Sequence, residues 1–191
     1  MRSDMKNPSR GPIIALIAVL AIGLGFFTDF VITCLEKQSY PQGYSEYVTV
    51  YAEKYGVPEH LIYSVIRTES DFESGAISRV GAVGLMQLLP STFQWLTDSI
   101  LFEHLNEGML HDPETNIRYG TYYLSFLYDR YGNWEVALAA YNGGPGNVDR
   151  WLADEAYADG EGGLRNIPFK ETKQFVSRVT KAWEKYDKLY S

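Results

Sequence analysis

The chain lacks the residues from which metal sites and disulfides are built. Cys34 is the single cysteine among 191 residues, so neither an intrachain disulfide nor a cysteine zinc site can form. The three histidines, His60, His104 and His111, show no HExxH motif or comparable ligand spacing. We therefore expect no bound metal, and we interpret the histidines as surface or helix-cap residues.

Basic residues are also scarce. Lys and Arg together number 17 against 24 Asp and Glu, which gives a formal net charge of −7. Without a basic stripe, binding to nucleic acid has no electrostatic support. The sequence has neither a glycine-rich phosphate loop after a strand nor a GxSxG motif, which disfavours two further enzyme classes. A neutral or locally recognised polymer, such as a glycan, remains compatible with this charge.

One long hydrophobic run stands apart from the rest. Residues 1–10 are polar and basic, and residues 12–28 are apolar without any charge. The run reaches the lower limit for crossing a bilayer, and its positive flank predicts an N-terminus that stays in the cytoplasm. No clean small-x-small cleavage site follows, and Thr33-Cys34 only loosely resembles a lipoprotein signal. We expect residues 1–39 to form an uncleaved single-span anchor or, as the alternative, a signal segment whose cleavage releases a secreted domain.

Helical patterns dominate residues 40–191, which we expect to form one all-α domain. Strand pairs with hairpin turns are not evident in the sequence. The helix expected over residues 134–141 has no polar face, so it should lie at the centre. The polar, glycine-rich stretch 154–167 is predicted to be a mobile surface loop or flap. The other helices are predicted at residues 44–55, 58–70, from 90 onwards, 112–131, 145–152 and 168–190.

Glu69 is the most informative residue of this domain. It follows Val65 by four positions and Ile66 by three, so it falls on the apolar, core-facing side of the helix 58–70. An ionised carboxylate is costly there unless it is paired or its pKa rises. A carboxylic acid that stays protonated near neutral pH suits general-acid catalysis on a glycosidic oxygen. From its position alone, Glu69 could also be a half-exposed glutamate with a purely structural role.

Further residues are candidates for binding a glycan. Gly81 and Gly84 would let the backbone approach a sugar ring, and Gln87 offers both a hydrogen-bond donor and an acceptor. Tyr141 ends a buried apolar helix, so its hydroxyl can point into a cleft while its ring packs. Asn142 follows at the helix C-cap, where bonding to the local backbone is the alternative role.

Four local motifs, taken together, carry a family resemblance. They closely resemble the lytic transglycosylases related to the soluble lytic transglycosylase (SLT type), whose lysozyme-like domain is shared by goose-type lysozymes. The resemblance covers about residues 44–190, and it implies a lysozyme-like α-helical catalytic domain within residues 40–191. The motifs are, in chain order, Glu69-Ser70-Asp71-Phe72, residues 78–87 (SRVGAVGLMQ), residues 139–146 (AAYNGGPG) and residues 167–172 (IPFKET).

The resemblance also adds site residues. It implies that Ser78 lies near the catalytic acid and the substrate, that Leu89 is a substrate-lining apolar residue, and that Tyr141 and Asn142 are functional. Phe175 departs from the family pattern, which usually has Tyr there, so one polar contact near the cleft is lost. We interpret Glu171, which matches a family glutamate, as a structural or positioning partner.

The activity implied by the resemblance is that of a peptidoglycan lytic transglycosylase that needs no cofactor. Glu69 would protonate the oxygen between N-acetylmuramic acid and N-acetylglucosamine and then take a proton from the 6-hydroxyl of the muramyl sugar, which gives a 1,6-anhydro product. Asp71 is a poor second carboxylate, because it would project about 200° away around a continuing helix.

The partner implied is peptidoglycan, on the wall-facing side of the plasma membrane. A hydrolytic muramidase on the same fold and an inactive glycan-binding scaffold are the competing hypotheses.

Overall fold

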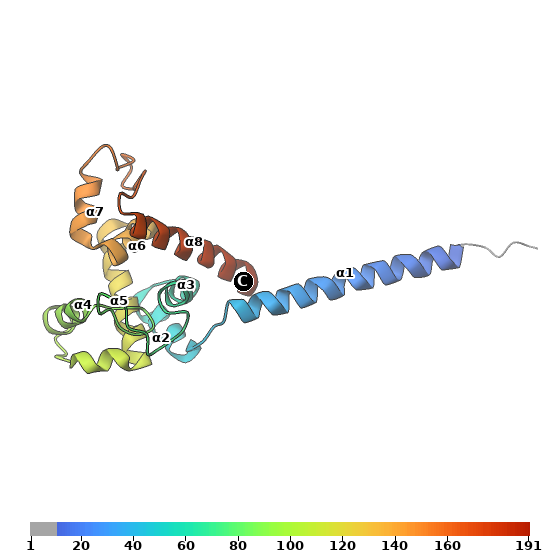
Figure 1. The fold of residues 1–191 in the computed structure, drawn as a ribbon, viewed down its shortest axis with the longest axis horizontal. Helices are drawn as coiled ribbons and strands as arrows, with labels where there is room; N and C mark the ends of the chain where they lie inside the picture. Colours follow the sequence, from blue (N-terminus) through green and yellow to red (C-terminus); the bar gives the residue numbers. More distant parts are fainter. Residues whose placement is uncertain (1–10) are drawn as a thin grey trace, which may run out of the picture. The chain divides into compact units, whose positions relative to one another are not determined.

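A computed structural model describes residues 11–191, and the chain divides into two compact units, Met1–Pro41 and Gln42–Ser191. The basic segment 1–10, from which we predict the orientation of the N-terminus, lies outside the described residues. The first unit contains one helix, α1 (Gly11–Ser39), and the second unit contains all the others (Figure 1).

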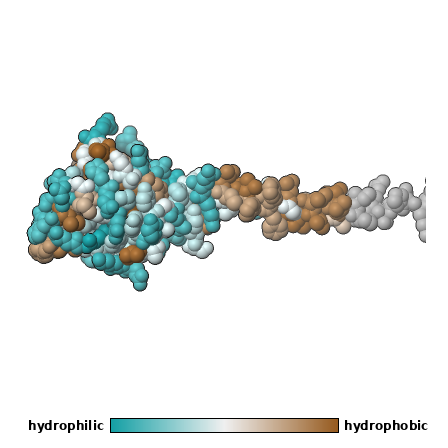
Figure 2. Space-filling view, turned by 90° about the horizontal axis from the view of Figure 1, so that it is seen from below, coloured by the Kyte–Doolittle hydropathy of each residue, from teal (hydrophilic) through white to brown (hydrophobic). Residues whose placement is uncertain are grey.

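The helix α1 is apolar on all sides. It continues through Asp29, whereas the sequence pattern separates an apolar run at 12–28 from a shorter one after it. Its segment Ile14–Ser39 is long and apolar enough to cross a membrane, by length and composition. Figure 2 shows hydrophobic residues over the surface of this helix and a mostly hydrophilic surface over the second unit. Both a membrane anchor and a signal segment fit these properties.

The second unit is all-helical, as predicted. Isolated β-bridges occur, but residues 11–191 contain no strand. Its elements, including a π-helical turn (η1) and a 3₁₀ helix (η2), are α2 (Ser45–Tyr55), α3 (Glu59–Glu69), α4 (Pro90–Trp95), η1 (Leu96–Ile100), η2 (Glu107–His111), α5 (Pro113–Tyr131), α6 (Trp134–Gly143), α7 (Pro145–Leu152) and α8 (Lys170–Tyr190).

Most helix ends follow local sequence signals. Gly56, with a φ of 66°, ends α2. The side chain of Asp112 accepts the backbone N–H of Thr115 at the start of α5. The helix α6 extends two residues beyond its predicted end at 141, because Gly144, with a φ of 84°, is the residue that leaves the helical conformation.

The helix α6 forms the centre of the domain, as its lack of a polar face predicts. Residues 136–140 are at most 1 % exposed. α6 packs against α5, α7 and α8, and α8 also packs against α3. The ends of α3 and α6 are thereby brought to the same side of α8.

Candidate active site

Residues from three distant parts of the sequence, namely α3 with the loop that follows it, α6 and α8, meet at one pocket with a volume of about 160 Å³. α3 and α6 contribute residues from their last turns, α8 contributes from its first turn, and the loop 70–89 supplies the rest. The six site residues predicted from the sequence all line this pocket. Its lining residues are Glu69, Ser78, Val80, Ala82, Gln87, Leu89, Tyr141, Asn142 and Glu171.

The carboxyl of Glu69 is partly buried at the end of α3. Burial raises the pKa of Glu69 from 4.5 to about 7. The guanidinium of Arg178 opposes this shift by stabilising the ionised carboxylate, and the carboxylate of Glu171 reinforces it. A carboxyl with a pKa near 7 can donate a proton at neutral pH and can also act as a base once it is ionised.

The chain turns sharply after Glu69. Asp71 and Phe72 have φ values of 50° and 67°, in the left-handed region, so α3 cannot continue. The hydroxyl of Ser70 donates to the backbone oxygen of Leu85 at 2.8 Å, which ties the helix end to the following loop. Asp71 and Glu73 are exposed, and neither lines the pocket. We expected Asp71 to point away from Glu69 on a continuing helix. The helix ends instead, and this turn is what keeps Asp71 out of the pocket.

Tyr141 joins the central helix to the loop. Its hydroxyl donates to the backbone oxygen of Met86 at 2.8 Å, and its ring stacks on Phe175 with the centroids 6.4 Å apart. Burial raises the pKa of Tyr141 well above its usual range, and the charge of Glu69 adds to this. The phenol therefore stays neutral beside the carboxyl, and its oxygen can still accept a hydrogen bond.

The polar side chains of the loop are oriented by the loop's own backbone. The amide nitrogen of Gln87 donates to the backbone oxygens of Ala76 and Gly84, at 3.0 and 2.9 Å. The hydroxyl oxygen of Ser78 accepts from the backbone N–H of Ala82 at 2.9 Å. Gln87 therefore presents its amide oxygen to a ligand as an acceptor, because its donors are already engaged. The sequence predicted that Gln87 would act as both hydrogen-bond donor and acceptor, and the structure leaves only the acceptor role open to a ligand.

Gly84 has a structural role that differs from the one expected. Its φ is 81°, and a Cβ placed there would collide with the side chain of Asn116 and lie 2.8 Å from the backbone oxygen of Leu110. The absence of a Cβ at Gly84 therefore makes room for Asn116, and the predicted approach of a sugar to this backbone stays a prediction. Gly81 also has a φ of 81°, but a Cβ there would meet open space.

Asn116 is the residue that sequence reasoning missed. It is 1 % exposed on α5, and its amide nitrogen donates to the backbone oxygens of Val83 and Leu110. Its amide oxygen accepts the backbone N–H of Met86 at 2.8 Å. Asn116 thereby fixes the loop that carries Ser78 and Gln87. The sequence carries no local signal for this role, because the partners of Asn116 are backbone groups of Val83, Met86 and Leu110.

Two further predictions concern the rim of the pocket. Asn142 lies in the last turn of α6 and not at its C-cap, because α6 runs on to Gly143. Its side chain is thus placed by the helix, partly buried against the pocket. Leu89 and Val80 are 40 % and 78 % exposed, and they form an apolar edge that could contact a sugar face or an acetyl methyl group.

The histidines do not line the pocket. His60 Nδ1 lies 2.6 Å from the carboxylate of Asp187, and His104 Nδ1 lies 3.1 Å from that of Asp98. Among residues 11–191, no group of three or more His, Cys, Asp or Glu side chains is placed to hold a metal. The pocket chemistry described above depends on Glu69, Tyr141 and their neighbours.

The second unit is an all-helical domain of the lysozyme-like superfamily, as its family match shows. Within it, the chain belongs to the Transglycosylase SLT domain family, whose model matches residues 46–163.

Among curated proteins, the chain is similar to two kinds of lytic transglycosylase. It is 34 % identical over 157 residues to the Soluble lytic murein transglycosylase of Escherichia coli (strain K12), covering 81 % of this chain and 24 % of that protein. It is 35 % identical over 138 residues to the Membrane-bound lytic murein transglycosylase C of Edwardsiella ictaluri, covering 63 % of this chain and 36 % of that protein. The chain thus spans about a quarter of the length of the soluble relatives it matches.

Solved structures show the same likeness. The 70 kDa soluble lytic transglycosylase from Escherichia coli matches with a TM-score of 0.73 and 33 % identity, covering 80 % of this chain and 25 % of that one. The lytic transglycosylase Slt from Pseudomonas aeruginosa, solved as an inactive Glu-to-Gln variant, matches with a TM-score of 0.69 and 35 % identity, covering 78 % and 25 %.

Proposed function

We propose that this protein is a peptidoglycan lytic transglycosylase that cleaves the bond between N-acetylmuramic acid and N-acetylglucosamine. The observation that carries the proposal is the partly buried carboxyl of Glu69, whose pKa is raised to about 7, in a pocket lined by the other predicted site residues. The inactivity of the Glu-to-Gln variant of the Pseudomonas relative supports a glutamate as the essential group.

The proposed reaction begins with proton transfer. Protonated Glu69 gives its proton to the glycosidic oxygen, the bond from the anomeric carbon to that oxygen breaks, and N-acetylglucosamine leaves with a hydroxyl. The acetamido group of the muramyl sugar stabilises the positive charge that develops at the anomeric carbon. The neutral phenol of Tyr141 and the side chain of Asn142 lie on the same pocket and orient this group.

The reaction ends within the same sugar. Ionised Glu69 takes the proton of the 6-hydroxyl, and the 6-oxygen attacks the anomeric carbon. Glu69 regains its proton, no water is consumed, and the products together have the composition of the substrate. The low solvent exposure that raises the pKa of Glu69 also disfavours water as the competing nucleophile.

A hydrolytic muramidase is the second candidate, and Glu171 is the observation that favours it. Glu171 places another carboxylate on the same pocket, where it could activate a water molecule. Its exposure on α8 and its effect on the pKa of Glu69 fit better with a group that adjusts the protonation of Glu69.

We also propose that α1 anchors the chain as a single span in the plasma membrane, with Gln42–Ser191 on the wall side. The apolar length of α1 and the similarity to membrane-bound relatives support this location. The basic residues Arg2, Lys6 and Arg10 before the helix support the orientation.

The test is digestion of purified peptidoglycan by the full chain, with mass spectrometry of the products. The proposal requires anhydromuramyl products, and hydrolysis would give products heavier by one water. Glu69→Gln should yield neither, because glutamine cannot donate the catalytic proton. Glu73→Gln, at an exposed position outside the pocket, is the matched control and should digest normally.

A further inference from the structure

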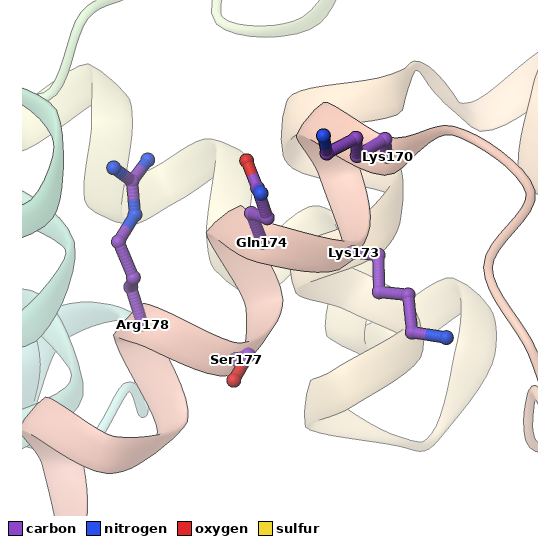
Figure 3. Close-up of a pocket in the computed structure, with 5 residues that line it drawn as sticks. All are labelled: Lys170, Lys173, Gln174, Ser177 and Arg178. Atoms are coloured by element: carbon purple, nitrogen blue, oxygen red, sulfur yellow. The ribbon is translucent and has the colours of Figure 1, made fainter.

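The exposed face of α8 contains a cluster of cations on a chain whose net charge is −7. Figure 3 shows this face, which borders a hollow with a volume of about 640 Å³. Three of its side chains are cationic and two can form hydrogen bonds with amides. The lining residues are Lys170, Lys173, Gln174, Ser177 and Arg178.

Helix geometry connects this hollow to the candidate active site. Lys170, Gln174 and Arg178 are spaced by four residues, and Figure 3 shows them projecting to one side of α8. Glu171, the neighbour of Lys170, lines the pocket that contains Glu69. A polymer seated at Glu69 would therefore pass along this face.

Two of the cations are available to a ligand. Lys173 donates to the side chain of Asn166 at 3.0 Å, which engages it with the segment before α8. Lys170 and Arg178 are exposed, and the ion pairs found within residues 11–191 involve neither of them. An acidic chain repels anions in general, whereas a local cluster of cations favours an anionic group where it lies.

We infer that the face formed by Lys170, Gln174, Ser177 and Arg178 binds the carboxylates of the peptide stems that branch from the glycan. This inference rests on the proposed function, because it concerns a second part of the same substrate. Lys170 and Arg178 donate charge-assisted hydrogen bonds to stem carboxylates, and Gln174 and Ser177 bond to peptide amides. The glycan itself, apart from its lactyl groups, offers no anion to such a face.

The experiment compares three forms of the same purified glycan strands, digested by the full chain in detergent. The first form carries native stems, the second carries stems whose carboxylates have been amidated, and the third has had its stems removed by an amidase, which leaves the lactyl carboxylate. We expect kcat/KM to be roughly three- to tenfold higher for native than for amidated stems, mainly through KM, because exposed ion pairs contribute modestly.

Three variants locate the effect. Lys170→Gln should lower the ratio of kcat/KM for native over amidated stems, and the double variant Lys170→Gln, Arg178→Gln should bring it close to 1. Lys188→Gln, near the other end of α8 and equally exposed, is the matched control and should keep the wild-type ratio.

Three results would overturn the inference. The wild-type chain could treat native and amidated stems alike, the preference could survive in the double variant, or stripped strands could match native ones, which would assign the face to the lactyl carboxylate. Absence of anhydromuramyl product from all three substrates would instead contradict the proposed function. Dissociation constants for the three strands, measured by co-sedimentation, then test the α8 face without turnover.

Discussion

At the scale of single residues, the protonation of Glu69 links the stability of the fold to pH. Its pKa is about 7 in the folded chain against an ordinary value of 4.5, so the folded state binds the proton more tightly than the unfolded state does. The stabilisation from this proton is complete below pH 4.5 and is lost as the pH rises through 7. At 1.36 kcal/mol per pKa unit, its upper limit is about 3 kcal/mol.

Glu69→Gln should therefore stabilise the chain at pH 8 relative to the wild type, by about 1–3 kcal/mol, because the variant has no carboxylate to ionise. At pH 4 the two proteins should differ less, since Glu69 is then protonated in both states. Thermal unfolding at both pH values measures this. A difference in melting temperature that does not change with pH would show that the pKa of Glu69 is not raised.

Glu171 and Arg178, the two residues of α8 whose charges act on Glu69, should shift the pH profile of activity in opposite directions when each is replaced. Under the proposed mechanism, activity is lost at high pH as Glu69, the proposed general acid, ionises. Glu171→Gln removes a charge that raises the pKa of Glu69, so this limb should move to lower pH. Arg178→Gln removes a charge that lowers the pKa, so the limb should move to higher pH. Each shift should be roughly half a pH unit, because exposed charges interact weakly. Profiles of kcat/KM that move in the same direction would contradict this.

The sequence allowed prediction of those site residues that stand out by their spacing within one helix or one short motif. Glu69 could be identified because its spacing from Val65 and Ile66 places it on the buried side of one helix. Asn116 could not, because its three hydrogen bonds go to backbone groups of a loop 30 and 33 residues earlier and to Leu110. The spacing of residues along the chain does not reveal hydrogen bonds from a helix to the backbone of a distant loop.

At the scale of elements, the loop 70–89 depends on α5 for its conformation. It has no strand or helix of its own, and its backbone includes positive φ values at Asp71, Phe72 and Gln87. The sequence therefore predicted the helices better than it predicted this loop. The helices follow from periodicity and caps, whereas the loop follows from Asn116 and from the hydroxyl of Tyr141.

Asn116→Ala should destabilise the chain by about 2–4 kcal/mol, because the backbone N–H of Met86 and the backbone oxygen of Leu110 lose their partner, whereas the oxygen of Val83 keeps the N–H of Leu88. It should also reduce turnover, since the same loop carries Ser78 and Gln87. Urea unfolding and digestion assays on the same preparations measure both effects.

Asn106→Ala is the control for this prediction. Asn106 is exposed and its side chain accepts one local hydrogen bond from Gly108, so its loss should cost less than about 1 kcal/mol. Equal destabilisation by the two substitutions would mean that the loop does not depend on Asn116.

At the scale of the whole molecule, the exposed apolar surface of α1 predicts where the chain resides. Leu20 and Leu24 are each 63 % exposed on this helix. Replacing both with Arg should release the full chain from membranes during alkaline carbonate extraction, because each Arg costs about 2.5–3.5 kcal/mol at the centre of a span.

The matched substitution lies in the second unit. Val50 on α2 is 54 % exposed, and Val50→Arg should leave the chain in the membrane fraction. Full extraction of the wild-type chain by carbonate would argue for a cleaved signal segment instead of an anchor.

The pocket is divided between α3, early in the second unit, and α8, at its end. A nascent chain that leaves the ribosome with its N-terminus first holds Glu69 long before it holds Glu171 and the packing surface of α8. Under the proposed function, a chain that ends before Lys170 would lack Glu171 and the packing surface of α8, so we expect it not to cleave peptidoglycan.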